Sequence, residues 1–224
     1  KPGETWSFND IVGDRKEDNG WKMAQGIYGG DRLTPQAGGG VCQVSTTLYN
    51  ALLQIYPNIE IVQREFHTYP STYVEKGLDA TVDTNHIDFQ FKNISDYDMY
   101  IYAYSSENKM SKSRKRDLTV VIYGQALPEG HSYKTRVVIV SEEAPGPDEI
   151  TESKELFIGE EKILAVARDK YVVDVYIDHY VNGEVVEEIY RIPGPDVYPG
   201  NPLKKLVGIL PTPTPEVSPT PTPS

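Results

Sequence analysis

Apolar residues recur at helical spacing in one long stretch of the chain, between residues 41 and 56. The residues of this stripe are Val44, Leu48, Leu52 and Ile55. Their spacing places them on one face of a helix, which predicts a buried stripe over roughly four turns. Pro57 follows directly and ends the predicted helix. The single cysteine of the chain, Cys42, then falls in the first turn.

The chain on either side of this helix has the patterns of β-strands and turns. Apolar and polar residues alternate strictly over residues 87–93 and nearly so over 99–104, and residues 59–62 and 118–123 are further strand candidates. A shorter run at residues 66–69 is a further strand candidate, and residues 1–37 indicate short strands and turns. The pattern predicts an α+β fold, in which a largely antiparallel sheet holds one main helix with the cysteine at its N-terminus.

A second part of the chain, from residue 134, shows only strand patterns. They cover residues 136–140, 162–166, 171–180 and 184–190, with an acidic loop expected over residues 141–152. Asn182-Gly183 predicts a tight hairpin turn. From Pro211 the chain repeats proline and threonine, which predicts a disordered, extended tail. We therefore expect a main domain at 1–127, a small all-β binding or spacer module at 134–210, and a tail at 211–224.

Composition and charge narrow the class of protein. A formal net charge of −11 argues against nucleic acid and an anionic membrane surface as partners, because both would repel the chain. No apolar run approaches the roughly 20 residues that a membrane helix needs. The chain opens at Lys1 without a methionine, so we expect a fragment whose export signal or membrane anchor lies upstream. The proline–threonine tail is common in exported bacterial proteins and favours an extracytoplasmic location.

Cys42 is the strongest candidate for chemistry. It follows Gly38-Gly39-Gly40 and opens a helix, where free N–H groups and the positive end of the helix dipole favour a nucleophilic thiolate. The alternative is a small buried cysteine that packs the helix against the sheet. The residues expected to form an oxyanion hole or to bind substrate beside Cys42 are Gly40, Val41, Gln43, Thr46 and Tyr49.

Acyl transfer by a cysteine also needs a proton acceptor, and the chain has four histidines. His67 is preferred because it follows an apolar strand and is flanked by aromatic residues, whereas His86 follows a turn. His131 lies in a connector and His179 in the second part, so both are expected to be solvated. A histidine that is simply hydrogen-bonded in a core or loop is the alternative interpretation of His67.

A third group usually orients the imidazole. Asp79, which can project from the turn at Gly77-Leu78, ranks ahead of Asp83. Metal binding is disfavoured because one cysteine and scattered histidines lack the paired spacing of zinc ligands. The glycines before Cys42 also lack the lysine and hydroxyl of a phosphate-binding loop. We expect no cofactor and no metal.

A series of motifs over about residues 1–125 resembles the VanW domain, which is named for an accessory protein of vancomycin-resistance clusters. The motifs occur in the family's order and are Pro2-Gly3-Glu4, Phe8-Asn9, Val12-Gly13, Gly38 to Ala51, Arg64 with His67, Tyr73-Val74, Gly77 to Val82, and Asp88-Phe89 with Phe91-Lys92-Asn93. The resemblance implies an exported Gram-positive cell-wall protein. It further implies peptidoglycan L,D-transpeptidase activity, which forms 3-3 cross-links between stem peptides through a cysteine.

Carried over by position, this resemblance implies Cys42 as the nucleophile and His67 as the base. Asp79 matches a family motif, and its orienting role is our inference. Thr68 stands where a serine is common in the family and keeps the hydroxyl, while His86 lies outside the family pattern.

The second part resembles the five-glycine extracellular module that often follows VanW domains and is linked with wall or sugar adhesion. Gly159 and Asn182-Gly183 match, but Arg168-Asp169-Lys170 replaces a glycine-rich stretch. The sequence therefore predicts a cysteine-dependent transpeptidase acting on stem peptides. The alternative is a non-catalytic wall-binding or scaffold protein in which Cys42 is structural.

Overall fold

The computed structural model of the chain describes residues 1–28, 32–69, 71–84, 86–110, 116–191 and 194–211. The chain divides into two compact units: residues 1–142 with 171–199, and residues 143–170 with 200–224. The first unit therefore combines segments that are far apart in the sequence. The domain boundaries at 127 and 134 stay predictions, and the predicted tail beyond residue 211 lies outside the described residues.

The main helix, α2, covers Val41–Leu53 and carries Cys42 at its second position, as the hydrophobic spacing predicted. It ends before the expected Tyr56. The N–H groups of Gln54 and Ile55 donate to the carbonyls of Ala51 and Leu52 in tight turns that close the helix.

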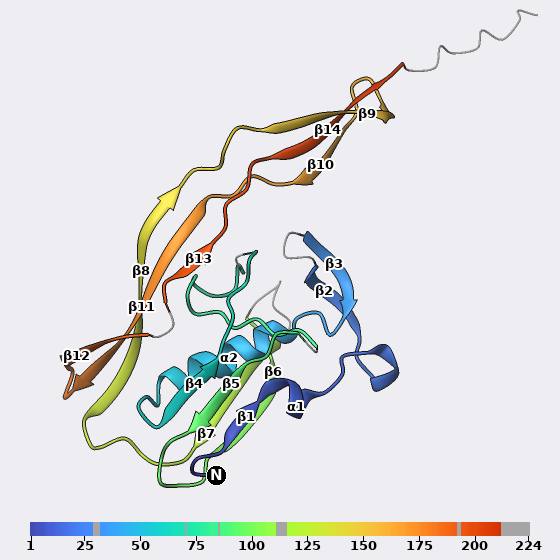
Figure 1. Cartoon of the computed structure of the whole chain (residues 1–224). Helices are drawn as coiled ribbons and strands as arrows, with labels where there is room; N and C mark the ends of the chain where they lie inside the picture. Colours follow the sequence, from blue (N-terminus) through green and yellow to red (C-terminus); the bar gives the residue numbers. More distant parts are fainter. Residues whose placement is uncertain (29–31, 70, 85, 111–115, 192–193, 212–224) are drawn as a thin grey trace, which may run out of the picture. The chain divides into compact units, whose positions relative to one another are not determined.

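A three-stranded antiparallel sheet packs against α2 (Figure 1). Its order is β1 (Thr5–Ser7), β5 (Gln90–Asn93) and β4 (Ile59–Gln63). Helix and sheet share one buried core, in which the Tyr49 ring meets the Phe89 ring edge-on at 5.6 Å. The core positions the N-terminus of α2 beside the chain that follows β4.

Two short elements and a hairpin precede α2. The helix α1 (Phe8–Val12) and a 3-10 turn (Glu17–Asn19) lie where only strands and turns were expected. The signal for α1 is Ser7, whose Oγ accepts a hydrogen bond from the Asp10 N–H at the helix start. The strands β2 (Met23–Tyr28) and β3 (Arg32–Ala37) then form an antiparallel hairpin.

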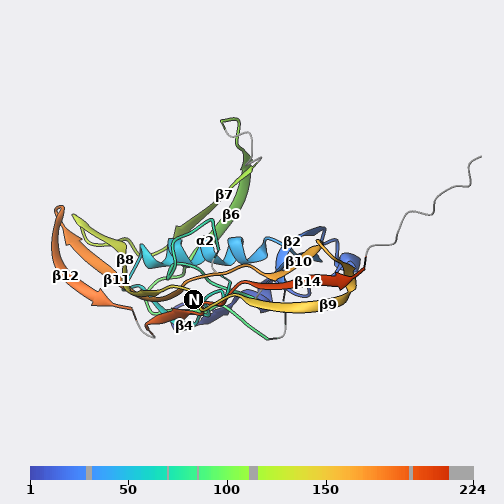
Figure 2. The same cartoon turned by 90° about the horizontal axis from the view of Figure 1, so that it is seen from above.

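A second antiparallel hairpin follows β5. Its strands, β6 (Tyr100–Glu107) and β7 (Arg116–Tyr123), agree with two predicted strands. The strand β7 contacts α2, and Figure 2 shows the hairpin extending away from this helix.

The last part of the first unit is a four-stranded sheet. It contains β8 (His131–Glu143), β11 (Lys170–Val181), β12 (Glu184–Tyr190) and β13 (Asp196–Tyr198). The predicted turn at Asn182-Gly183 is confirmed, with φ of 51° and 90° at the two residues. The buried side chains of Val173, Val175 and Ile177 belong to the same core as α2.

The second unit is a three-stranded sheet in the order β10 (Glu161–Ala165), β14 (Lys204–Leu210) and β9 (Glu149–Phe157). The strands β9 and β14 run parallel, whereas β10 and β14 run antiparallel. The expected loop over residues 141–152 is wrong at both ends, since β8 continues to Glu143 and β9 begins at Glu149. Exposed charged side chains, such as Glu149 paired with Lys204 at 2.8 Å, give this strand the composition of a loop.

Two further expectations are corrected. The first unit holds several small sheets instead of one largely antiparallel sheet. The strand expected at residues 66–69 is absent from the described residues, where Glu65 forms only an isolated bridge to Thr81. The physical reason is that the His67 N–H donates to the Asp79 carboxylate at 2.6 Å and so is lost to a strand ladder.

Candidate functional site

The local backbone geometry requires glycine at each of the three positions before α2. Gly38 and Gly40 have φ of 77° and 90°, a left-handed conformation that other residues rarely adopt. A Cβ on Gly39 would lie 2.2 Å from the Ala24 carbonyl oxygen. The turn that brings the chain from β3 into α2 therefore requires glycine at all three positions, and it fixes where Cys42 begins the helix.

Cys42 is half-buried and free. Its thiol donates to the Val82 carbonyl at 3.3 Å. Within the helix start, the Val41 N–H donates to Gly38 O at 3.1 Å and the Gln43 N–H to Gly40 O at 3.0 Å. Among the residues that the structure describes, the N–H groups of Gly40 and Cys42 have no acceptor. These two amides are therefore free to stabilise an oxyanion, whereas the other two are engaged.

His67 lies in the chain after β4 and is buried. Its Nδ1 is 2.7 Å from Asp79 Oδ2, and its backbone N–H donates to the same oxygen at 2.6 Å. Two contacts from one residue to one carboxylate oxygen fix both the ring and the chain that carries it. With Nδ1 directed at Asp79, the Nε2 atom remains for chemistry.

The other oxygen of Asp79 is also fully engaged. Tyr198 in β13 donates its hydroxyl to Asp79 Oδ1 at 2.5 Å, and the same hydroxyl accepts from the Gly77 N–H at 2.6 Å. Arg64 Nη2 lies 3.1 Å from Asp79 Oδ1. The Asp79 carboxylate thus accepts four hydrogen bonds from three residues, and its pKa is lowered because these interactions outweigh its burial.

A buried cluster of charges supports Arg64. Its Nη1 lies 2.7 Å from both carboxylate oxygens of Asp196, and its Nε donates to the Asp79 carbonyl at 2.6 Å. Arg191 Nη2 lies 2.9 Å from Asp196 Oδ1. Arg64 and Arg191 therefore form one buried cluster with Asp79 and Asp196, in which the two positive charges balance the two negative charges.

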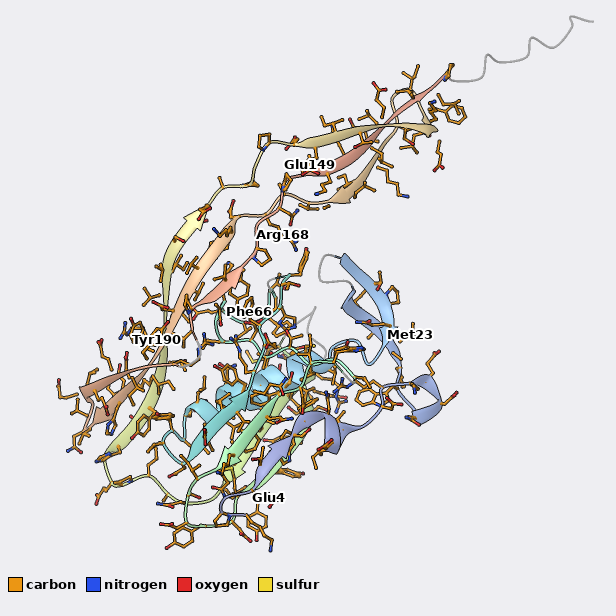
Figure 3. The ribbon with its side chains drawn as sticks, in the orientation of Figure 1. Glu4, Met23, Phe66, Glu149, Arg168 and Tyr190 are labelled. Atoms are coloured by element: carbon orange, nitrogen blue, oxygen red, sulfur yellow. The ribbon has the colours of Figure 1, made fainter. Side chains whose placement is uncertain are left out.

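Aromatic rings enclose this cluster. The Arg64 guanidinium lies over the Tyr49 ring at 5.4 Å and over the Phe66 ring at 5.8 Å. Phe66, labelled in Figure 3, also packs against Tyr198 with 5.0 Å between ring centroids. Phe66, which directly precedes His67, therefore packs on Tyr198, the residue that donates a hydrogen bond to Asp79.

The surroundings of His67 favour its charged form. Burial disfavours the imidazolium, but hydrogen bonds to Asp79 and to Cys42 and the nearby charges outweigh it and raise the pKa of His67 to about 9. The imidazole therefore carries a proton at neutral pH, the form that can pair with a thiolate. The contribution from Cys42 places the thiol within the electrostatic reach of His67.

Tyr73 lies beside His67. Its ring meets the His67 ring edge-on, with 6.4 Å between centroids. Burial of its hydroxyl, together with the charge of Cys42, raises the pKa of Tyr73 to about 12 despite a hydrogen bond to Thr46. Tyr73 therefore stays a neutral hydrogen-bonding group beside the thiol.

The structure places the remaining candidates for substrate binding as follows. Thr46 is buried and accepts from the Ala80 N–H at 3.0 Å, while Tyr49 is fully buried and its hydroxyl accepts from Arg191 at 3.3 Å. Both residues therefore stabilise the site through buried hydrogen bonds. Gln43 is exposed at the start of α2.

The other titratable candidates lie apart from Cys42. His86 and Asp83 are exposed and form an ion pair of 3.2 Å with each other. His131 and His179, expected to be solvated, instead form a half-buried pair in which the two ring nitrogens are 2.9 Å apart. The expectation of solvation was wrong because Tyr133 stacks on His179 with 4.5 Å between ring centroids.

Several residues of the site were missed by the sequence reasoning. Arg64 stood in a family motif without a role, while Asp196, Tyr198 and Arg191 were assigned to a separate module. Arg15, a buried cation that interacts with Cys42, was counted among turn residues. Buried charged residues signal their importance only once their partners are known, and the partners here lie more than a hundred residues apart in the chain.

No three His, Cys, Asp or Glu side chains of the described residues are grouped as metal ligands would be. Of the helices in the described part of the chain, none combines the length and the apolar character needed to cross a membrane.

The family described as VanW like protein matches residues 1–113, half of the chain. The chain belongs to this family, which confirms the resemblance seen in its motifs. It is 47% identical over 92 residues to the uncharacterized protein YoaR of Bacillus subtilis (strain 168), covering 41% of this chain and 29% of YoaR.

A second relative is the vancomycin B-type resistance protein VanW of Enterococcus faecalis (strain ATCC 700802 / V583). It is 32% identical over 115 residues, which cover 49% of this chain and 41% of that protein. The chain therefore spans less than half the length of both relatives. Among solved structures, that of HP0197-G5 is 26% identical and covers 35% of this chain and 97% of that chain, with a TM-score of 0.19. A TM-score this low carries no structural argument.

Proposed function

We propose that this protein is a cysteine acyltransferase of the bacterial cell wall, and specifically a peptidoglycan L,D-transpeptidase. The observation that carries the proposal is the buried His67, oriented by Asp79 at 2.7 Å and coupled to Cys42 at the start of α2. Burial without a mechanistic role would favour a neutral histidine. Instead, hydrogen bonds from Arg64, Tyr198 and His67 hold Asp79 charged, and Asp79 keeps His67 protonated beside a thiol.

In the first half-reaction, Cys42 loses to solvent the proton that it donates to Val82 O, and the resulting thiolate is paired with the His67 imidazolium. The thiolate attacks the carbonyl that follows the third residue, a diamino acid, of a donor stem peptide. The tetrahedral intermediate carries its negative charge on oxygen, where the free N–H groups of Gly40 and Cys42 stabilise it. Collapse breaks the peptide bond, and the His67 imidazolium protonates the departing amine of the terminal D-residue. A thioester and a neutral imidazole result.

In the second half-reaction, the side-chain amine of an acceptor stem attacks the thioester. The neutral His67 accepts the proton that the amine loses, and the Cys42 thiolate leaves as the new amide forms. The starting pair of thiolate and imidazolium is then restored. Asp79 stays ionised throughout and keeps the imidazole ring in one orientation.

Location and partners follow from the same proposal. The relative from Enterococcus faecalis is named a vancomycin B-type resistance protein, which supports action on the cell wall. We place the protein outside the cytoplasm, in the wall or on the surface of a Gram-positive bacterium, with stem peptides as partners. The net charge of −11 supports partners other than nucleic acid.

The test is covalent capture. The protein is incubated with a stem tetrapeptide or a carbapenem, and its intact mass is measured. We expect an adduct on the wild-type protein, none on Cys42→Ala, and formation slowed by at least about 100-fold in Asp79→Asn, because the imidazole loses its orienting charge. Formation of an adduct at the same rate in Cys42→Ala would overturn the proposal.

A non-catalytic wall-binding or scaffold role is the second candidate. It is favoured by the structural need for all three glycines and by the bond from the Cys42 thiol to Val82 O. In that case no adduct forms on the wild-type protein, Cys42→Ala leaves wall cross-linking unchanged, and the main effect of the substitution is on stability.

A further inference from the structure

A groove of about 370 Å³ runs beside the Cys42 site, between α2, the Tyr73–Val74 segment and β7. Its floor is a single stripe of α2 that begins at Gln43 and ends at Gln54. Eleven steps of a helix span roughly 16 Å. An extended peptide advances about 3.3 Å per residue, so the floor has the length of about five residues.

The wall opposite the helix is the edge of a strand. Leu118, Thr119 and Val120 line the groove as three successive residues of β7, with none from β6. A groove over the face of a sheet would meet alternate residues, because side chains alternate between the two faces. In the part of the chain that the structure describes, β7 pairs with β6 alone. The unpaired backbone edge of β7 therefore faces the groove.

The groove and the candidate catalytic site share residues. Thr46 and Tyr73 line the groove, and the Tyr73 ring meets the His67 ring at 6.4 Å between centroids. Gln43, at one end of the floor, directly follows Cys42. Thr46 lies one turn after Cys42 on the same face of α2, so the groove passes beside the helix turn that carries the thiol, although Cys42 itself does not line it.

The lining mixes polar and apolar side chains and carries no formal charge. All eleven lining residues are neutral, and the chain as a whole has a net charge of −11. Free carboxylates on a bound peptide would lose water in the groove without meeting a cation, which is costly. Side-chain amides, by contrast, supply both a donor and an acceptor, as an amide on the ligand requires.

The side-chain amides in the groove can still form hydrogen bonds with a ligand. Asn50 donates both hydrogens of its amide to the carbonyls of Thr46 and Leu78, each at 2.7 Å, so its oxygen is left as an acceptor. Gln54 donates to Asn50 O at 3.2 Å and likewise keeps its oxygen. The side-chain amide of Gln43 has no partner among the described residues.

We propose that the groove between α2 and β7 binds an extended peptide of about five residues that carries no free carboxylate, along the free edge of β7, and that this peptide is the acyl donor for Cys42. The proposal rests on the transpeptidase function above and makes it more specific. Stem peptides whose free carboxylates are converted to amides are the preferred donors, since amides match the neutral lining. Main-chain hydrogen bonds to β7 supply affinity, as in other cases of strand addition.

The first experiment measures binding without turnover. The full chain with Cys42→Ala is titrated by calorimetry with a stem tetrapeptide carrying free carboxylates and with the same tetrapeptide in amidated form. We expect at least tenfold tighter binding of the amidated form. Ala51→Arg, which places a long side chain in the groove, is expected to weaken that binding at least tenfold. Ala103→Arg adds the same side chain to β6 outside the groove and is the matched control.

Charge substitution at Gln54 gives a second readout. Gln54→Lys is expected to improve binding of the free-carboxylate peptide several-fold, and Gln54→Glu to weaken it. Alkylation of Cys42 by iodoacetamide, measured in the same variants with the cysteine restored, is expected to stay within twofold of wild type. Unchanged alkylation shows that the variants keep the fold and the site.

The outcomes separate the two proposals. If the wild-type protein forms an acyl-enzyme but Ala51→Arg and the Gln54 variants behave like Ala103→Arg, the groove proposal is overturned and the transpeptidase proposal stands. If no acyl-enzyme forms but the amidated peptide binds and Ala51→Arg loses it, the groove is a peptide-binding site, and the transpeptidase proposal is overturned together with the donor role of the peptide. A change in sedimentation with Ala51→Arg, without a change in peptide binding, assigns the β7 edge to contacts between copies and overturns the groove proposal.

Discussion

The hydroxyl of Tyr198 donates to Asp79 Oδ1 at 2.5 Å across 119 positions of sequence. The Tyr198 ring is fully buried, and its hydroxyl also accepts from the Gly77 N–H. One side chain therefore fixes both the carboxylate that orients His67 and the turn from which that carboxylate projects. The strand β13 is thus part of the site, although it comes from the end of the first unit.

Tyr198→Phe removes the hydroxyl but keeps the aromatic ring, and it is expected to weaken the site. A hydrogen bond to a buried carboxylate is lost, and the Gly77 N–H loses its acceptor, so we expect the free energy of unfolding to fall by about 2 kcal/mol. The pKa of His67 is expected to fall as well, because Asp79 is held less firmly. Chemical denaturation measures the first effect, and an NMR titration of the His67 ring measures the second.

Tyr190→Phe is the matched control for this substitution. The Tyr190 hydroxyl donates to Asp174 at 2.7 Å on the exposed side of the same unit. Its loss is expected to leave the pKa of His67 unchanged. Equal shifts of the His67 titration in both variants would contradict the positioning role of Tyr198.

The pair of Arg64 and Asp196 is expected to show strong coupling. Arg64→Met leaves Asp79 and Asp196 without their shared cation, and we expect a loss of about 3–5 kcal/mol in the free energy of unfolding. Asp196→Asn is expected to cost less in the Arg64→Met background than alone, with a coupling energy of about 1–3 kcal/mol. Urea denaturation of the two single variants and the double variant completes the cycle.

Lys16→Met is the control for this cycle, because Lys16 pairs with Asp14 and both side chains are exposed. Its effect is expected to be much smaller, since water and salt screen exposed pairs. Strict additivity of Arg64→Met and Asp196→Asn would show that the cluster does not act as a unit.

Local patterns predicted the local parts of this site. The spacing of apolar residues predicted α2 with Cys42 in its first turn, and the family motifs pointed to His67 and Asp79, which the structure brings into contact. The glycine run was interpreted as a sign of chemistry, whereas Gly39 is required because β2 passes close to it. A close approach by another strand leaves the same sequence signal as a close approach by a substrate.

The supporting parts of the site could not be predicted, because they depend on contacts between distant segments. Nothing near Tyr198 or Asp196 in the sequence indicates a partner in the region of Asp79. Alternating strand patterns in residues 171–198 predicted β-structure correctly, but the pattern carries no information on which core the strands join. The loop that positions His67 was interpreted as a strand because a side chain, not a neighbouring strand, satisfies its backbone.

Gly39→Ala is expected to disturb the turn that begins α2. The added Cβ would lie 2.2 Å from a backbone oxygen, so β2 or the turn must move. We expect a loss of about 3 kcal/mol in the free energy of unfolding, within the range of substitutions that strain a packed core. The rate of Cys42 alkylation is expected to change as well, because the helix start shifts.

Gly146→Ala is the control, since Gly146 has open space around its Cβ position and an ordinary backbone. Thermal unfolding of both variants, with alkylation monitored by mass spectrometry, makes the comparison. If Gly39→Ala is as stable and as reactive as Gly146→Ala, the close approach to Ala24 does not define the turn.

The stability of the first unit is expected to fall as the pH rises from about 6.5 to about 9. Below this window His67 is protonated in both the folded and the unfolded chain, and the interaction with Asp79 contributes in full. Within the window the unfolded chain releases the proton while the folded chain keeps it, since the pKa of His67 is about 9 in the folded protein and that of a free histidine side chain is about 6.5. Above the window both states are neutral, and the contribution is gone.

The expected loss across this window is roughly 3–4 kcal/mol, from a pKa difference of about 2.5 units at about 1.4 kcal/mol each. Asp79 stays ionised throughout, because its pKa is lowered. Tyr73 titrates later, near pH 12. Urea denaturation at a series of pH values tests the slope, with His67→Gln as the variant in which it should vanish. A wild-type slope equal to that of His67→Gln would mean that His67 is neutral in the folded protein, and that Cys42 has no imidazolium partner at neutral pH.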